Sequence, residues 1–290
     1  MELLGIVAAI ASAASWAFGT LMFDRLGRDI PPAGITFIKG SLSIVFMALL
    51  TLFYNGFVSV GSIECVYLAI SGIIGIAVGD TFFFKSLRDL GPKVQVLFFM
   101  LGQVMTMILS FVFLGEILSI KEYIGALILL IGVMVVIWDR QEEHPNKARG
   151  IIYGILSIMC FSASSIIIKY SIDEIDVVSA TFYRMFFGTI GVLFVGVSSQ
   201  KISGWIAPLK DIRILSLFVL NVLVITFGGF LLSTVAIKYI SVSLASVLST
   251  TEPIFVLLFA YFINHDIATK RELLGATITI LGLLIVILNG

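Results

Sequence analysis

Long apolar stretches alternate with short polar breaks along the whole chain. A membrane-spanning helix needs about 20 mostly apolar residues, and breaks at charged residues, glycine and proline divide the sequence into ten stretches of roughly that length. The ten predicted spans are 3–23, 33–54, 64–86, 94–114, 122–138, 150–171, 178–198, 212–235, 242–263 and 271–289. Such stretches differ from the alternating segments of about ten residues that form an outer-membrane barrel. The pattern therefore predicts an all-α integral membrane protein with ten transmembrane helices.

Composition indicates that lipid is the surrounding solvent. The 290 residues are 59% hydrophobic and only 12% charged, and the mean hydropathy is +1.13. A water-soluble domain could not bury so much apolar surface, so we expect a multi-pass protein of the cell membrane, embedded in the lipid bilayer. The formal net charge is zero, which argues against a nucleic-acid partner. Cys65, Cys160, His144 and His265 are too scattered for a disulfide framework or a metal site, and no cofactor is expected.

The sequence repeats itself. A shift of 145 residues superimposes Phe37-Ile38-Lys39 on Phe182-Tyr183-Arg184. After five extra residues within 200–211 the shift becomes 150, and Glu116-Ile117 then falls on Asp266-Ile267. This register predicts two repeats of five helices each, residues 1–138 and residues 150–290, joined by the hydrophilic linker 139–149.

Five spans is an odd number, so the second repeat must enter the membrane in the opposite orientation to the first. The positions of lysine and arginine support this inversion. These residues follow spans one and three in the first half but spans seven and nine in the second, and the inversion brings all of these loops to one face of the membrane. Twelve cations share this face: Arg25, Arg28, Arg88, Lys93, Arg140, Lys147, Arg149, Lys201, Lys210, Arg213, Lys270 and Arg271. Three mark the other face: Lys121, Lys169 and Lys238. The positive-inside rule makes the crowded face cytoplasmic, which places both termini outside.

Inverted repeats are typical of secondary transporters, because two equivalent halves can rock about a central site and open it to either side. Architecture alone does not establish a function, so polar residues within the predicted spans must supply the chemistry. A charge in the hydrocarbon costs about 2.5 to 3.5 kcal/mol on insertion scales and usually faces a protein interior or a watery cavity. Four charged residues stand out in this way: Lys39, Asp80, Arg184 and Glu252.

Depth along the spans predicts two ion pairs. At about 1.5 Å per residue, Lys39 and Asp80 lie at similar depth, roughly 9 Å from the same face. By the same measure, Arg184 and Glu252 lie roughly 9 and 15 Å from the opposite face, within reach of an arginine side chain. We therefore predict Lys39–Asp80 and Arg184–Glu252 pairs within a substrate-binding or coupling site. The alternative is that each pair only holds two helices together.

The richest polar patch is Ser249-Thr250-Thr251-Glu252-Pro253 in the ninth span. Pro253 cannot donate a backbone hydrogen bond, so the carbonyl of Ser249 is freed and the helix should kink. Lipid tolerates such an opening only where protein or water satisfies it, which makes Glu252 a candidate substrate contact or proton acceptor. The alternative is a packing kink with a buried, hydrogen-bonded acid. Gly102-Gln103 occupies the equivalent positions in the first repeat, so the centre is not symmetric.

Further side chains are candidates for the wall of a cavity. They are Ser15, Trp16 and Thr20 on the first span, Gln103 on the fourth, Ser164 and Ser165 on the sixth, Tyr183 on the seventh and Asn221 on the eighth. For the hydroxyls the alternative is a hydrogen bond within their own helix. Glycines with small-xxx-small spacing are expected to pack instead, because they let helices approach closely. This group comprises Gly75, Gly79, Gly125, Gly132, Gly275 and Gly282.

Several motifs follow one another in a specific order. They are "ASWAFG" (14–19), the cation in the second span of each half, "VGDTFFFKSLRDLGP" (78–92) with its counterpart "GGFLLSTVAIKYISV" (228–242), "EPIFVLLFAYFINHD" (252–266), and "GEILSIKEYIGALILLIGV" (115–133) with "HDIATKRELLGATITILGL" (265–283). Over nearly the whole chain this order resembles the drug/metabolite transporter superfamily, specifically ten-span proteins with two EamA-type repeats. The resemblance implies export or exchange of small metabolites through a central cavity lined by both repeats.

Two features depart from the pattern of that family. Gln103 stands where the fourth span usually has a proline. The family also generally keeps its termini in the cytoplasm, opposite to the orientation that the charges predict.

Other functional classes fit less well. "AVGD" (77–80) is similar to the GxGD motif of intramembrane aspartyl proteases, but Ala77 replaces the first glycine and no second aspartate lies inside a span to share a catalytic proton. The GxxxxGK[ST] loop of ATP-driven pumps is missing from the sequence. We therefore predict a secondary active transporter and not an enzyme, exporting or exchanging a small metabolite such as an amino acid or related zwitterion. A channel or a non-transporting scaffold is the alternative, and proton coupling and a monomeric or homodimeric state stay open.

Overall fold

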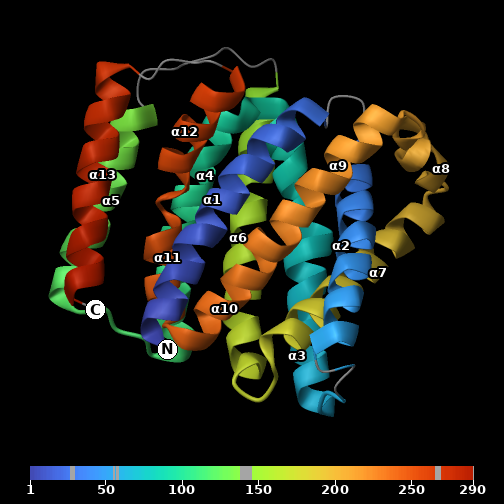
Figure 1. The fold of residues 1–290 in the computed structure, drawn as a ribbon, viewed down its shortest axis with the longest axis horizontal. Helices are drawn as coiled ribbons and strands as arrows, with labels where there is room; N and C mark the ends of the chain where they lie inside the picture. The colour runs from blue at the N-terminus through green and yellow to red at the C-terminus, as the bar shows by residue number, and fades with distance from the viewer. Residues whose placement is uncertain (27–29, 55, 57–58, 138–145, 265–268, 290) are drawn as a thin grey trace.

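The computed structural model describes residues 1–26, 30–54, 56, 59–137, 146–264 and 269–289, and all regular structure in them is helical (Figure 1). The first half contains α1 (Glu2–Leu26), α2 (Pro32–Tyr54), α3 (Ser62–Gly72), the π-helical segment η1 (Ile73–Asp80), α4 (Thr81–Leu114) and α5 (Ile120–Ile137). The second half contains α6 (Lys147–Ile172), α7 (Val177–Ser198), α8 (Ile202–Ile206), the 3₁₀ turn η2 (Ala207–Lys210), α9 (Ile212–Val224), the π-helical segment η3 (Ile225–Leu231), α10 (Leu232–Tyr239), α11 (Val242–Ser249), α12 (Glu252–Asn264) and α13 (Lys270–Asn289).

Seven described helical segments are long and apolar enough to cross a membrane: Glu2–Leu26, Pro32–Tyr54, Ser62–Gly91, Lys147–Ile172, Val177–Ser198, Ile212–Tyr239 and Val242–Phe259. Two shorter apolar helices accompany them, Phe98–Leu114 and Leu273–Ile287. Helix also lies within every one of the ten predicted ranges. The predicted all-helical membrane fold is therefore confirmed.

Three boundaries differ from the prediction. Helix continues beyond residue 86 to Gly91, and residues 147–149 of the predicted linker belong to α6. The two extensions meet, because Arg149 donates to both carboxylate oxygens of Asp89 at 2.8 and 2.9 Å. Residues 202–210, predicted as loop, form α8 and η2, where Trp205 is buried against Gly34 and its ring lies 5.8 Å from that of Phe37 on α2. Residues 138–145 of the predicted linker lie outside the described residues.

The third and fourth predicted spans are separated at Gly91, inside α4. Gly91 has φ 72° and ψ 169°, a conformation that a side chain would strain. Pro92 follows, and proline suits the first position of a helix because its missing N–H group is not needed there. The matching boundary in the second half is Ser241, whose hydroxyl accepts a hydrogen bond from the N–H of Leu244 and caps α11. The two halves thus turn at equivalent positions by different means.

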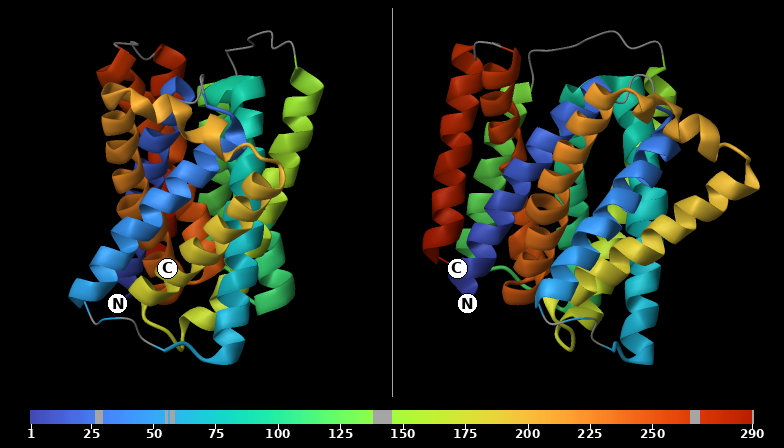
Figure 2. Two further views of the ribbon diagram at one scale, coloured as in Figure 1. Left: turned by 90° about the vertical axis from the view of Figure 1, so that its right-hand side faces the viewer. Right: turned by 45° about the vertical axis from the view of Figure 1, so that its right-hand side comes forward.

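Helices of the two halves pack against each other in a reciprocal pattern. α1 lies against α9, η3 and α10 of the second half, while its counterpart α6 lies against α3 and η1 of the first. α2 packs on its counterpart α7, and α5 packs on its counterpart α13. Figures 1 and 2 show α5 and α13 side by side at one edge of the bundle and the two termini at the same end. The halves therefore share one core and do not form separate bundles.

Glycines allow the close approach of α5 and α13. A Cβ atom added at Gly125 would lie 2.9 Å from the carbonyl oxygen of Gly282, and one added at Gly132 would lie 2.5 Å from the backbone nitrogen of Thr279. Backbone atoms cannot turn aside as a flexible side chain can, so larger residues would push the helices apart. The predicted packing role of Gly125, Gly132 and Gly282 is confirmed.

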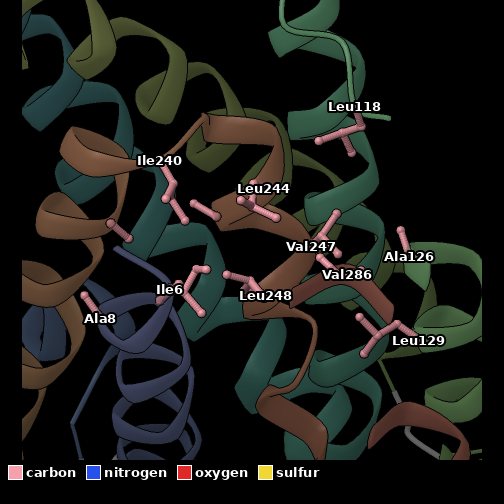
Figure 3. Close-up of a cluster of buried hydrophobic side chains, with 13 residues drawn as sticks. Ile6, Ala8, Leu118, Ala126, Leu129, Ile240, Leu244, Val247, Leu248 and Val286 are labelled. Atoms are coloured by element: carbon pink, nitrogen blue, oxygen red, sulfur yellow. The ribbon is translucent and has the colours of Figure 1, made fainter. Parts of the chain in front are cut away.

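An apolar cluster joins this helix pair to the rest of the bundle. Figure 3 shows buried side chains of α1, α5, α11 and α13 meeting there, together with one from each of the connections before α5 and α11. The labelled members are Ile6, Ala8, Leu118, Ala126, Leu129, Ile240, Leu244, Val247, Leu248 and Val286. The cluster packs along α11, and the chain continues from α11 directly into the central site.

A carboxylate also ties the first half to the start of α11. Glu116, in the connection between α4 and α5, accepts hydrogen bonds from the backbone N–H groups of Val242 at 3.0 Å and Ser243 at 2.9 Å. Its carboxylate also accepts a hydrogen bond from the hydroxyl of Ser110. The first N–H groups of a helix have no partner within that helix, so Glu116 satisfies groups that would otherwise need water.

Candidate functional site

A cavity of about 140 Å³ lies at the centre of the bundle, with walls from both halves. Its polar side chains are Ser12, Thr20, Gln103, Thr106, Ser162, Ser165, Arg184, Ser233, Ser246, Ser249 and Glu252. Its aromatic side chains are Trp16, Phe83, Phe99, Phe161 and Phe230. One water needs roughly 10 to 15 Å³ of such space, so the cavity has room for on the order of ten waters. That is enough for one small metabolite.

Lys39 of α2 and Asp80 of η1 form an ion pair behind the cavity wall. Their side chains are 0% and 1% exposed, and neither lines the cavity. The Lys39 ammonium also lies 4.6 Å from the ring centroid of Phe230 and 5.6 Å from that of Trp16, distances at which an aromatic ring attracts a cation. The predicted pair is confirmed, and both of its side chains are almost fully buried.

Arg184 of α7 is buried but reaches the cavity. Its Nη2 donates a hydrogen bond to the hydroxyl of Ser164 on α6 at 2.9 Å. The guanidinium also interacts electrostatically with the carboxylate of Asp80. Its Nε is buried and has no hydrogen-bond partner among the described residues. Arg184 thus offers a charged donor that the protein leaves unused.

Close packing of α3 and η1 on α6 creates the place for this guanidinium. The hydroxyl of Ser71 donates to the carbonyl of Ser164 at 2.9 Å, and the hydroxyl of Ser164 donates to the carbonyl of Ser71 at 2.8 Å. Because the Ser164 proton is engaged in this way, its oxygen accepts from Arg184. A Cβ atom at Gly75 would lie 2.4 Å from the Ser164 hydroxyl oxygen and 3.4 Å from the Arg184 Nη2. The glycine therefore leaves room for the hydrogen bond between them.

Glu252 lies where the ninth span is broken. α11 ends at Ser249 and α12 begins at Glu252, directly before Pro253. The hydroxyls of Thr250 and Thr251 fill the break by donating to carbonyl groups of α11 at 2.6 and 2.8 Å. Glu252 is 3% exposed and lines the cavity, and its Oε2 has no hydrogen-bond partner among the described residues.

The predicted ion pair between Arg184 and Glu252 is wrong. Both side chains line the same cavity, but the partners of Arg184 are Ser164 and Asp80, and Glu252 retains an unpaired oxygen. The reason is lateral packing. α7 lies against α3 and η1, so its arginine faces the first-half aspartate, whereas α12 lies against α1. Depth along the spans does not specify which helices are neighbours.

The remaining predicted residues divide into two groups. Trp16 and Gln103 line the cavity with Arg184 and Glu252. Tyr183 and Asn221 do not line it. Tyr183 packs beside an apolar cluster with members from α3, α6, α7, α10 and α11. The buried Asn221 donates to the carbonyl of Gly19 at 3.4 Å, which joins α9 to α1.

Of the predicted hydroxyl side chains, Thr20 and Ser165 line the cavity and Ser15 and Ser164 do not, whereas Ser12, Thr106 and Ser162 escaped sequence reasoning. Ser12 donates to the carbonyl of Gly229 at 2.8 Å, and Ser162 donates to the carbonyl of Gly102 at 3.0 Å. Thr106 donates to Ser162 at 2.9 Å. Serine and threonine often bond to nearby backbone, so in a sequence a cavity hydroxyl has no signal that separates it from a packing hydroxyl.

Metal-binding side chains do not gather in the described part of the chain. No three His, Cys, Asp or Glu residues there are close enough to hold a metal ion. Cys65 and Cys160 are separate free thiols, and His144 and His265 lie outside the described residues. The chemistry that the described cavity offers is that of one guanidinium, one carboxyl group, an amide and several hydroxyls.

Two matches to one known family agree with the two halves of the bundle. The EamA-like transporter family matches residues 3–138 and, a second time, residues 148–288. The chain belongs to the EamA-like transporter family. This EamA protein therefore carries the family unit twice, and both units contribute to the cavity.

Relatives and a solved structure resemble the EamA protein along much or nearly all of its length. An uncharacterized transporter of Archaeoglobus fulgidus is 21% identical over 286 residues, which cover 99% of each chain. An uncharacterized transporter of Synechocystis sp. is 24% identical over 223 residues, 74% of this chain and 63% of its own. A crystal structure described without a function has a TM-score of 0.72 and 18% identity over 99% of this chain and 96% of its own, which shows a shared fold. The EamA protein is thus a multi-pass membrane protein of a transporter family.

Proposed function

We propose that this EamA protein is a secondary active transporter that carries a small zwitterionic metabolite, such as an amino acid, through the central cavity. One observation supports this above all: the cavity contains two buried groups that can carry opposite charges, and each has an atom without a hydrogen-bond partner among the described residues. Arg184 offers its Nε donor and Glu252 its Oε2 acceptor. A buried charged group left unpaired is costly. A molecule that supplies both a carboxylate and an ammonium group satisfies the two sites together.

The rest of the wall suits the body of such a molecule. Phe83, Phe99 and Phe161 offer apolar contact, while Gln103 and the hydroxyls offer hydrogen bonds. Small-molecule sites commonly combine a mostly apolar lining with a few polar groups that fix orientation. The cavity volume of about 140 Å³ limits the cargo to one small molecule.

In this proposal the ten helices form two inverted five-helix repeats that rock about the cavity in the cell membrane, for export or exchange. The reciprocal packing of α1 and α6 supports a two-fold relation, because each lies against the other half. Alternating access by two such units exposes one site to each side in turn. The start of α6, which carries Lys147 and Arg149, lies at the end opposite the two termini. The sequence groups twelve cations on that face, and the positive-inside rule then makes it cytoplasmic.

Binding and flux measurements test the proposal. Purified protein is screened by thermal shift against L-amino acids, each matched with the amine that lacks its carboxylate and the acid that lacks its ammonium. One matched set is phenylalanine, phenethylamine and hydrocinnamate, and another is leucine, isoamylamine and isocaproate. We expect the intact amino acid to give the largest shift in its set. If no amino acid shifts the folded protein more than its two fragments do, the zwitterion assignment fails.

The amino acid with the largest shift is then followed in sealed vesicles that contain the protein. A carrier gives saturable uptake that rises when unlabelled substrate is present on the opposite side, because exchange is faster than net transport. Non-saturable flux indicates a channel, and no flux through correctly inserted protein indicates a scaffold. Repeating the uptake with an imposed pH gradient tests whether protons are the coupling ion.

A further inference from the structure

We propose that position 230 determines which charge the substrate site accepts. Phe230 stands where the first half carries Asp80, and this replacement leaves Arg184 without an acidic partner in its own half. The inference rests on the proposed function, because it explains why the second half can receive an anionic group from a ligand. It adds a specificity-determining residue that contributes no polar contact of its own.

The alignment of the two repeats shows which residues are equivalent. A shift of 145 residues places Lys39 on Arg184, and a shift of 150 places Asp80 on Phe230. The local backbone agrees, because Asp80 ends the π-helical segment η1 and Phe230 lies in the π-helical segment η3. π-helical turns are rare and frequently occur at functional sites. The two halves therefore place an acid and a phenylalanine at equivalent positions of an unusual backbone.

Phe230 lies close to the charged residues. The Phe230 ring centroid is 4.6 Å from the Lys39 ammonium, and the ring lines the same cavity as Arg184. It meets the Trp16 ring edge-on, with the ring centroids 4.9 Å apart. A side chain at position 230 is thus beside the Lys39–Asp80 pair and shares a cavity with Arg184.

The charges of these groups do not cancel. Lys39 and Asp80 neutralise each other in the closed ion pair. Arg184 interacts electrostatically with Asp80, but Asp80 is bonded to Lys39, and the Nε of Arg184 has no hydrogen-bond partner among the described residues. The group of Lys39, Asp80, Arg184 and Phe230 therefore has an excess of one positive charge, and Arg184 and Phe230 line the cavity. An acid at position 230 would cancel it, whether that acid approached Arg184 or Lys39.

Three substitutions test this inference: Phe230→Asp, its near-isosteric neutral control Phe230→Asn, and Phe230→Leu, which removes the ring without adding a polar group. Dissociation constants are measured for phenylalanine and phenethylamine. Relative to Phe230→Leu, we expect phenylalanine to bind about tenfold or more weakly to Phe230→Asp and about threefold more weakly to Phe230→Asn, since a charge-assisted hydrogen bond is worth more than a neutral one. Phenethylamine, which has no carboxylate, should not be weakened.

The outcomes separate this inference from the proposed function. Equal binding of phenylalanine to the Asp, Asn and Leu variants overturns the role of position 230. If Phe230→Asp does not yield folded protein, the Asn and Leu pair decides by the same criterion. Arg184→Ala is measured alongside: if it leaves phenylalanine binding unchanged, the anion-binding role of Arg184 fails and with it the proposed function. If Arg184→Ala weakens binding but the position 230 variants do not, only the present inference fails.

Discussion

Two sets of buried charged side chains in this protein differ in whether a protein group of opposite charge is bonded to them. Lys39 and Asp80 form a closed pair, almost fully buried and bonded to each other. Arg184 and Glu252 are open, because each lines the cavity and has a buried atom without a hydrogen-bond partner among the described residues. A closed pair has nothing left to offer a ligand, whereas open groups gain from one. Under the proposed function, the presence or absence of a bonded counter-charge among the described residues would therefore separate groups that support the bundle from groups that bind substrate.

The largest expected effect comes from opening the closed pair. Asp80→Asn leaves the Lys39 ammonium buried without a counter-charge, which costs about 3 to 5 kcal/mol. We expect a large loss of folded protein, measured as the yield of monodisperse protein and its thermal midpoint. The double variant Lys39→Met with Asp80→Leu should recover most of that loss, because apolar residues often replace a buried ion pair without penalty.

The double variant also tests the comparison itself. If it folds and transports normally, the pair is structural. If it folds but has lost transport, then Lys39 and Asp80 take part in the transport cycle, and a closed pair in this structure does not indicate a purely structural group.

The second effect concerns the open cation. Arg184→Ala removes a charge-assisted hydrogen bond worth about 1.5 to 3 kcal/mol, so phenylalanine and hydrocinnamate should bind about tenfold to hundredfold more weakly. Phenethylamine should bind as before, and the thermal midpoint without ligand should change little. Titration calorimetry with the three compounds gives the measurement. Equal weakening of all three would mean that the substitution deforms the cavity.

The third effect concerns the open acid. Glu252→Gln keeps the shape of the side chain but removes the negative charge, so phenylalanine and phenethylamine should bind about tenfold more weakly, as expected for the loss of one charge-assisted bond. Hydrocinnamate, which lacks the ammonium, is the matched control and should be unaffected. A Glu252→Gln protein that binds phenylalanine with wild-type affinity would remove Glu252 from the binding site.

The smallest effect concerns the positioning of Arg184. Ser164→Ala removes the acceptor for Nη2 and should weaken phenylalanine binding about threefold, the size of a neutral hydrogen bond. Ser165→Ala is the matched control, because Ser165 is the next residue of α6 but forms no hydrogen bond with Arg184 in the described part of the chain, and its hydroxyl donates to the carbonyl of Phe161 in its own helix. Phenethylamine distinguishes positioning from general damage, since it should bind equally to both variants. If the two alanine variants behave alike, Ser164 has no special role.

Sequence reasoning succeeded where one local cause sufficed. Pro253 lacks an N–H group, and a break in the helix lies directly before it. The pair of Lys39 and Asp80 was predictable because both residues lie at the same depth from the same face. Depth also matched Arg184 to Glu252, but that pair is not formed, because α7 and α12 have different neighbours. Tyr183 and Asn221 have the right polarity for a cavity, yet packing turns them to other contacts.

The amino-acid sequence was sufficient to predict an all-helical membrane protein with two repeats and to single out its buried charged residues. These are local properties, since a segment in hydrocarbon must satisfy its own backbone hydrogen bonds as a helix. The partner of each buried charge required the folded bundle. Which helices lie side by side and which way each helix faces depend on packing along their whole length, from the glycine contacts of α5 and α13 to the serine pair beside Arg184. A rotation or shift of one helix changes every partnership on it, so the cavity, with its arginine and its glutamate, is a property of the tertiary structure.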